Sequence, residues 1–294
     1  MVRAFPNRHT VSVQNRDRIL LCCDLDRTLL PNGPQPESPI ARPLLRQLAA
    51  RPEISLAYVS GRDKVLLEAA IAEYALPRPD YAVGDVGTTI YEVNATGWQL
   101  WEAWHEEIAP DWHGQTREQL AALFTDLAPL RLQEAEKQNR FKLSYYLPLD
   151  VPRAPLLATM EQRLEARGVQ ASLIWSVDEP ENIGLLDLLP ARATKRHAVE
   201  FLLAQHGFRP EQTVFAGDSG NDLPVLISGL PAVLVRNASD EVQAEALAGA
   251  RRADHAETLY IAKGGLLGMN GNYSAGVLEG LVHYHPQTLA WLQA

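Results

Sequence analysis

The stretch LLCCDLDRTLLPNG, residues 20–33, decides the fold of this chain. Its apolar residues continue a run that begins at Ile19, and the run ends at two carboxylates one residue apart, Asp24 and Asp26. An apolar run of this length beside turn-forming residues is typical of a buried β-strand. Two neighbouring carboxylates repel each other. They are therefore either a solvated strand end or the partners of a bound cation.

Strand-like runs alternate with helix-like segments along most of the chain. Further apolar runs lie in ISLAYVS (54–60), YAVG (81–84), TVFAG (213–217) and AVLVRN (232–237). This alternation predicts an α/β fold, with a parallel sheet covered by helices on both faces. Because ligands bind at the carboxyl ends of parallel strands, we expect Asp24, Ser60 and Asp218 to share one rim of the sheet.

The segment 89–186 has a different pattern. Strand-like TIYEV (89–93), RFKLSYYLPL (140–149) and QASLIWS (170–176) are separated by helix-like TREQLAALFTDLAPL (116–130) and APLLATMEQRLEARG (154–168). This β-α-β-α-β order predicts a small α+β unit inserted into the parallel-sheet domain, as a cap over its rim. The predicted domains are a core of residues 1–88 and 187–294 and a cap of residues 89–186.

Composition limits the classes of partner. The formal net charge of the 294 residues is −9, which argues against nucleic acid or an anionic membrane surface as the main partner. Residues 1–18 contain no apolar signal segment, and no apolar run reaches the length of about 20 residues that spans a bilayer. Cys22 and Cys23 are adjacent on a strand, so they should point to opposite faces as buried thiols. We expect a cytoplasmic protein, with a long loop at the Gly/Asn-rich residues 263–276.

The spacing of the first two carboxylates permits phosphoryl transfer. One carboxylate, Asp24, can attack phosphorus, and the second, Asp26, can protonate the leaving alcohol. A bound Mg²⁺ would offset their repulsion, since this ion binds through one or two carboxylates and phosphate oxygens. The stretch GDSGND, residues 217–222, adds Asp218 and Asp222 after another predicted strand. Alone, it is equally compatible with a turn that caps a helix.

Two further residues fit such a site. Ser60, in YVSGR, can bind a phosphate oxygen through its hydroxyl, with the Gly61 amide beside it. Lys195, in LPARATKRHAVEFL, falls in the first turn of a predicted helix, where its ammonium can offset the charge of the phosphoryl group. The alternatives are an ordinary surface turn and a solvated lysine.

Together these stretches resemble a known superfamily. The stretches DLDRT, SGR, LDLLPARATK and GDSGND resemble the four motifs of the haloacid dehalogenase (HAD) superfamily. The resemblance implies a Rossmann-like core with an inserted cap of the C2B type. VGDVGTTIY, FKLSYYLPL and SAGVLEG resemble more closely the sucrose-phosphate phosphatases and related sugar-phosphate phosphatases, over residues 19–284.

The resemblance assigns roles to the rim residues. It implies that Asp24 is the nucleophile, that Asp26 is the general acid and base, and that Lys195 and Ser60 bind the phosphoryl group. The residues assigned to Mg²⁺ are Asp24, Asp26 through its backbone carbonyl, Asp218, and Asp222 as an orienting carboxylate. Ser219 and Asn221 are expected to support these ligands.

Residues of the cap are expected to select the substrate. Lys142 and Ser144 lie two apart on a predicted strand, so they share a face that either binds sugar oxygens or is solvated. The other residues assigned to the substrate are Gly61, Arg62 and Thr88. The tryptophans at helical spacing, Trp98, Trp101 and Trp104, with Trp112 beyond, are expected in the core of the cap, and a sugar-stacking platform is the alternative.

The predicted activity is hydrolysis of a disaccharide phosphate, with sucrose 6-phosphate as the first candidate. Phosphates of mannosylfructose, trehalose or glucosylglycerol are alternatives within the same reaction. A phosphomutase, or a non-catalytic partner of a sucrose-phosphate synthase, remains open. That synthase is also the candidate protein partner of an active phosphatase.

Overall fold

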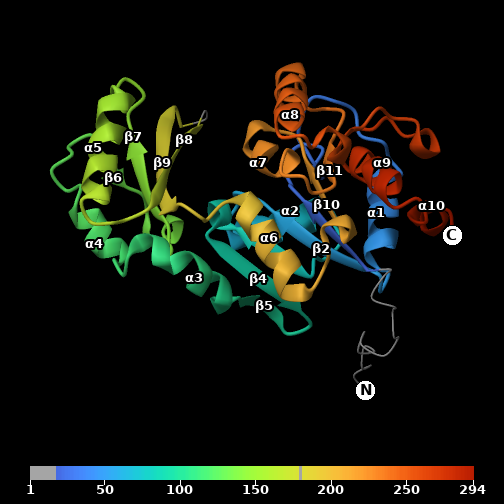
Figure 1. The fold of residues 1–294 in the computed structure, drawn as a ribbon, viewed down its shortest axis with the longest axis horizontal. Helices are drawn as coiled ribbons and strands as arrows, with labels where there is room; N and C mark the ends of the chain where they lie inside the picture. The colour runs from blue at the N-terminus through green and yellow to red at the C-terminus, as the bar shows by residue number, and fades with distance from the viewer. Residues whose placement is uncertain (1–17, 179–180) are drawn as a thin grey trace.

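A computed structural model describes residues 18–178 and 181–294. Residues 1–17, which belong to the segment expected to lack a signal sequence, lie outside the described residues. Figure 1 shows two parts, a larger core at the right and a smaller green-to-yellow unit at the left. Within the described ranges, no helix is long and apolar enough to cross a membrane.

The core is built on an eight-stranded sheet. Its order is β12 (Leu259–Ile261), β11 (Ala232–Leu234), β10 (Thr213–Gly217), β1 (Ile19–Cys23), β2 (Ile54–Val59), β3 (Tyr81–Gly84), β4 (Thr89–Asn94) and β5 (Gly97–Leu100). The strands from β12 to β3 are parallel, and β4 and β5 are antiparallel. The predicted α/β sheet is therefore confirmed, with an antiparallel hairpin added at one edge.

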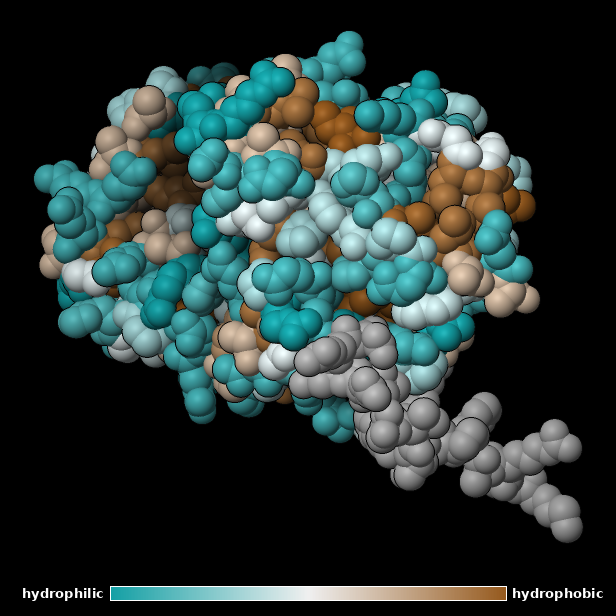
Figure 2. All heavy atoms as spheres, turned by 45° about the vertical axis from the view of Figure 1, so that its right-hand side comes forward, coloured by the Kyte–Doolittle hydropathy of each residue, from teal (hydrophilic) through white to brown (hydrophobic). Residues whose placement is uncertain are grey.

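Helices cover both faces of this sheet, as its uninterrupted apolar strands require. One face packs against α1 (Ala41–Ala49), α2 (Lys64–Glu73), α9 (Ser274–Tyr284) and α10 (Thr288–Leu292). The other packs against α6 (Lys195–His206), α7 (Leu223–Leu226) and α8 (Asp240–Arg252). Cys22 and Cys23 belong to opposite faces, and both are buried free thiols, as predicted. On the surface in Figure 2, hydrophobic residues form separate patches among hydrophilic ones.

The cap has its own antiparallel sheet, in the order β6 (Arg131–Leu132), β7 (Leu143–Leu147), β9 (Ile183–Pro190) and β8 (Ala171–Asp178). The helix α5 (Arg153–Glu165) buries Leu156, Met160 and Leu164 in the core of this unit. The remaining helices are α3 (Glu102–Ile108) and α4 (Arg117–Ala122). Figure 1 shows α5 on the side of the cap sheet that is turned away from the core.

The structure corrects the predicted boundaries of the cap. TIYEV was expected to open the cap, but it forms β4, which pairs with β3 in the core sheet. The predicted boundary after residue 186 cuts β9, which stays in the cap sheet as far as Pro190. The alternating pattern of TIYEV fits either sheet, and its short connection to β3 decides between them. Only the short turn of residues 85–88 separates β3 from β4, so the two strands form a hairpin.

The tryptophans are packing residues, as expected, although they do not all belong to the cap. Trp104 and Trp112 are fully buried. Trp101 packs edge-on against Phe201 of α6, and Trp98 lies in β5 of the core sheet. The rings of Trp101 and Trp104 both contact Phe201 and so join the cap to the core, while Trp112 packs on Phe141 within the cap. These contacts argue against a sugar-stacking platform.

Candidate active site

The predicted rim residues meet at the carboxyl ends of three adjacent parallel strands. Asp24 follows β1, Ser60 follows β2 and Asp218 follows β10, and β1 lies between the other two strands. A cavity of about 450 Å³ opens at this rim. Its lining residues are Asp24, Asp26, Arg27, Ser60, Gly61, Arg62, Leu66, Asp218, Ser219 and Asn221.

A tight turn after β1 brings the first carboxylates together. The buried Leu25 carbonyl accepts hydrogen bonds from the amides of Thr28, Leu29 and Leu30, which folds the chain back at once. The Thr28 hydroxyl then lies 3.4 Å from an Asp24 oxygen and 3.3 Å from an Asp218 oxygen. Thr28 thus bridges two strand ends that are far apart in sequence.

Asp24 is a buried carboxylate with a lysine against it. The Nζ of Lys195 donates to its Oδ1 at 2.8 Å. Burial raises the pKa of Asp24 to about 7; Lys195 works against this, while Asp222 and Asp218 add to it. Burial and the charge of Asp222 likewise raise the pKa of Asp218 to about 6. The rim therefore holds more negative charge than its own lysine balances.

Lys195 is placed by the start of α6, where the Thr194 hydroxyl caps the helix by accepting from the His197 amide. Its ammonium also donates to Asp222 at 2.8 Å and to Asn221 at 3.1 Å. Burial lowers the pKa of Lys195, but the charges of Asp222 and Asp24 outweigh that effect and raise it above its usual range. Lys195 therefore stays protonated.

Asp222 organises the GDSGND turn. Its Oδ2 accepts hydrogen bonds from the amides of Asp218 and Ser219, at 3.0 and 3.1 Å, and from the Ser219 hydroxyl at 3.2 Å. A Cβ at Gly217 would lie 2.5 Å from the Asp222 side chain, so only glycine fits there. Asp222 thus has one oxygen on Lys195 and the other on the turn, and it joins the two.

Asp26 lines the same cavity as Asp24 but has different partners. Arg62 donates to both of its oxygens, at 2.8 and 2.6 Å, and Asn32 donates to Oδ1 at 2.7 Å. Partial burial raises the pKa of Asp26, but the hydrogen bonds and charge of Arg62 outweigh burial, and the pKa falls below its ordinary value. Asp26 is therefore held as a carboxylate at the mouth of the cavity.

The donor set at the rim fits a hard divalent cation. Asp24, Asp218 and Asp222 each offer a carboxylate oxygen, and these atoms lie within 4.8 Å of one another. Oxygen ligands of this kind suit Mg²⁺. Both Asp222 oxygens accept close hydrogen bonds, from Lys195 and from the amides of the turn. Asp24 and Asp218 each keep one oxygen whose hydrogen bond is only the long one to Thr28, so they are the carboxylates best placed to bind the metal.

Three residues predicted to bind substrate are not part of this cavity lining. The buried Thr88 hydroxyl donates to the Asp85 carbonyl and accepts from Asn139, both at 2.8 Å. The buried Ser144 hydroxyl donates to Asp187 within the cap. Lys142 is half-buried and lies close enough to Asp85 to lower that carboxyl's pKa, although burial, the largest influence, leaves it raised.

Two residues of the cavity region had been missed, Arg27 and Asn32. Arg27 lies inside the DLDRT motif, but the sequence does not show that its side chain turns toward the cavity. Asn32 lies in a Pro/Gly-rich loop, and the sequence predicts only a connection there, without a role in the site. Ser219 and Asn221 lie where predicted, beside Asp222 and Lys195.

The parallel core, the inserted cap and the lysine–aspartate rim define a phosphoric monoester hydrolase of the HAD superfamily. The chain belongs to the sucrose-6F-phosphate phosphohydrolase family, whose model matches residues 17–285. It is 59% identical over 280 residues, 95% of this chain, to a protein of Nitrosococcus oceani named only as a HAD-like hydrolase, and spans 75% of that protein.

Two sucrose-phosphatases are also similar. Sucrose-phosphatase 1 of Nicotiana tabacum is 28% identical over 76% of this chain, and the chain spans about half (52%) of that protein's length. The crystal structure of the sucrose-phosphatase from Synechocystis, in complex with sucrose and phosphate, superimposes with a TM-score of 0.66 at 26% identity. The likeness covers 91% of this chain and 98% of that one. The chain is therefore a sugar-phosphate phosphatase of this family.

Proposed function

We propose that the chain is a Mg²⁺-dependent phosphatase that converts a disaccharide phosphate, sucrose 6-phosphate first, to the sugar and phosphate. The observation that carries the proposal is the buried Asp24 carboxylate with the Lys195 ammonium 2.8 Å from one oxygen. A carboxylate next to a fixed cation can attack phosphorus, because the cation offsets the charge of the incoming phosphate.

In the first step an Asp24 oxygen attacks phosphorus, and the bond between phosphorus and the sugar oxygen breaks. The electron pair stays on the sugar oxygen, which takes a proton from Asp26. Because Asp26 is a carboxylate in the free protein, it must first take up this proton when the substrate binds, and the second step returns a proton to it. Ser60 and Gly61, which line the cavity, bind phosphate oxygens, and Lys195 offsets their charge. The product of this step is an aspartyl phosphate on Asp24.

In the second step Asp26 takes a proton from water, and the water oxygen attacks phosphorus. Asp24 leaves as a carboxylate, and phosphate is released. The hydrogen bonds from Arg62 favour the carboxylate form of Asp26, which is the form that this step needs. Mg²⁺ bound by Asp24, the Asp26 carbonyl and Asp218 would reduce the repulsion between these carboxylates and the phosphate.

The choice of sucrose 6-phosphate is supported by the matched family and by the likeness to a sucrose-phosphatase solved with sucrose and phosphate. The cap supplies part of the selectivity in this proposal through Lys142, and Arg62 of the core adds a substrate contact at the rim. Thr88 of the core and Ser144 of the cap act through packing, since their hydroxyls already bind Asp85, Asn139 and Asp187.

Phosphate release from a panel of sugar phosphates, with and without Mg²⁺, tests the proposal. We expect Mg²⁺-dependent release that is fastest on sucrose 6-phosphate and falls by about 10⁴-fold or more in Asp24→Asn. Equal rates on simple hexose phosphates would contradict the substrate but not the mechanism. Absence of release on every compound, from folded protein, would contradict the enzyme.

A cytoplasmic location and a sucrose-phosphate synthase as protein partner are part of the same proposal. The partner rests on the family resemblance, and the location is supported by the two free buried thiols, Cys22 and Cys23. Co-elution of the purified chain with such a synthase in size-exclusion chromatography checks the partner, and separate elution at micromolar concentrations of both would contradict it.

A further inference from the structure

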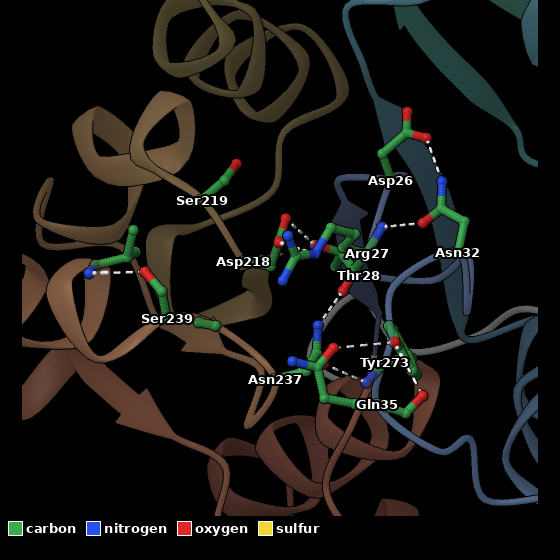
Figure 3. A network of polar contacts seen from close by, with 12 residues as sticks. Asp26, Arg27, Thr28, Asn32, Gln35, Asp218, Ser219, Asn237, Ser239 and Tyr273 are labelled. Atoms are coloured by element: carbon green, nitrogen blue, oxygen red, sulfur yellow. Dashed lines mark hydrogen bonds and ion pairs between the residues drawn. The ribbon is translucent and has the colours of Figure 1, made fainter. Parts of the chain in front are cut away.

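The turn after β1 carries a cation that the proposed reaction does not use. Arg27 lies between Asp26 and Thr28, and its side chain lines the cavity while 44% of it stays exposed. Its Nε lies 3.6 Å from Oδ2 of Asp218 (Figure 3). A guanidinium is therefore directed at one of the two carboxylates best placed to bind the metal.

The backbone of Arg27 has an energetic cost. Its φ of 59° lies in the left-handed region, where the Cβ crowds the following carbonyl and where glycine, asparagine or aspartate are the usual residues. Conformations of this kind persist where the surrounding structure enforces them and are concentrated at functional sites. A long cationic side chain at this position indicates that the guanidinium itself is needed.

Two asparagines enforce this conformation from either side. The Arg27 amide donates to Oδ1 of Asn32 at 2.8 Å, and Nδ2 of Asn237 donates to the Arg27 carbonyl at 2.6 Å. Asn237 in turn accepts from the amide of the fully buried Tyr273 at 2.8 Å (Figure 3). The Gly/Asn-rich segment 263–276 therefore braces the catalytic turn through its Tyr273.

The three buried carboxylates at the rim, Asp24, Asp218 and Asp222, are divided between two cations. Lys195 donates to Asp24 and Asp222, whereas Arg27 lies beside Asp218 and lowers its pKa against the raising effects of burial and Asp222. A divalent ion that binds Asp218 must therefore share this carboxylate with a guanidinium or displace it. Repulsion between the two cations weakens the binding of the metal.

We propose that Arg27 is a built-in counter-cation of Asp218 that competes with Mg²⁺ for this carboxylate and so sets the affinity of the metal site. The inference rests on the proposed function, because it takes Asp218 as a metal ligand. According to this inference, the left-handed turn, its two asparagines and the 263–276 segment all serve to hold the guanidinium at this carboxylate.

Isothermal titration of Mg²⁺ into the full chain, without substrate, tests the proposal. We expect Arg27→Gln to bind Mg²⁺ about tenfold more tightly, as the loss of one partly exposed charge near the site implies. Arg27→Lys should stay within about threefold of the unchanged protein, since it keeps the charge. Arg209→Gln, an exposed arginine that pairs with Glu211, is the matched control and should leave the affinity unchanged.

Arg27→Asn removes the charge with a residue that suits the left-handed backbone, so it gives a second, well-folded variant. Unchanged or weaker Mg²⁺ binding in both Arg27→Asn and Arg27→Gln would overturn the inference. Asp218→Asn separates this failure from a failure of the metal site. If Asp218→Asn binds Mg²⁺ as well as the unchanged protein does, Asp218 is not a ligand, and the proposed metal site and the inference both fail.

Discussion

The rim of the core and the sheet of the cap use buried polar residues in opposite ways. At the rim, Lys195 holds two buried carboxylates, and the neighbouring residues open onto a cavity. In the cap, the buried Ser144 hydroxyl is bound to Asp187 on the neighbouring strand β9. The rim thus presents its charges to a ligand, whereas this cap pair stabilises the sheet that carries it.

The two regions touch through a few polar contacts. Asn139 of the cap donates to Thr88 of the core at 2.8 Å, and the Lys137 ammonium lies 4.0 Å from an Asp63 carboxylate oxygen. The comparison teaches that the chemical step depends on residue types at strand ends. Under the proposed function, selection of the substrate depends on how the separately packed cap is placed relative to these residues.

After Asp24→Asn, the largest effect is expected at the rim, from Lys195→Met. Loss of the ammonium removes the cation at Asp24, the proposed nucleophile, so we expect kcat to fall by about 10²- to 10³-fold. Asp222 is fully buried and would lose its charged partner, so the free energy of unfolding should fall by about 3 kcal/mol. Kinetics and urea unfolding measure both. Arg196→Ala, an exposed neighbour paired with Glu200, is the control and should change stability by less than about 0.5 kcal/mol.

The pH dependence of stability should also belong to the rim. Burial is the main cause that raises the pKa of Asp24 to about 7 and the pKa of Asp218 to about 6, above the ordinary range of an aspartate. Between pH 4 and 7 the native protein therefore binds more protons than the unfolded chain. The contribution of these groups is full below pH 4 and is lost as pH rises through 6 and 7.

Urea unfolding without Mg²⁺, at pH values from 4 to 8, measures this loss. Asp24→Asn should show a shallower fall in the free energy of unfolding over the same range, because it lacks one of the two groups. A slope that is equal in the two proteins would assign the pH dependence to other residues.

In the cap, Ser144→Ala distinguishes a packing role from a substrate contact. Removal of the hydroxyl leaves Asp187 without its hydrogen bond inside the cap, so we expect a loss of about 1–3 kcal/mol in stability. The KM for the best sugar phosphate should change by less than about threefold, with kcat unchanged. A large rise in KM at unchanged stability would instead make Ser144 a substrate ligand, as first predicted from its strand position.

The smallest effect is expected where the two regions meet, from Lys137→Ala. Its ion pair with Asp63 is long and half-exposed, and such pairs contribute about 0–1 kcal/mol. We expect stability and kcat to stay nearly unchanged in urea unfolding and steady-state kinetics. A marked change in kcat would mean that this contact controls the placement of the cap, and Asp63→Asn should then produce the same change.

The positions of the rim residues could be predicted from the sequence, because each is a polar residue next to an apolar run. Each of the residues Asp24, Ser60 and Asp218 follows a strand, and parallel pairing brings them to one rim without any knowledge of loop structure. The placement of Lys195 at a helix start could also be predicted, because its segment continues as an apolar-periodic helix.

The boundaries of the cap could not be read in the same way. TIYEV fits either sheet by its alternation, and only its pairing with β3 assigns it to the core. Ser144 and Lys142 share a strand pattern with many solvated residues, and their partners, Asp187 and Asp85, come from distant parts of the chain. Such pairings depend on non-local packing, which local patterns do not encode.

By itself, the sequence determined the fold class and the two carboxylates after the first strand. It also determined that the other rim residues lie at the same edge of the sheet. These follow from hydrophobic periodicity and from the rule that parallel strands end on one side of a sheet. Only the tertiary structure decided that Arg62 binds Asp26, that Arg27 faces Asp218, and that Ser144 is turned into the cap. The directions of these side chains depend on turns and buried partners that come together only when the chain has folded.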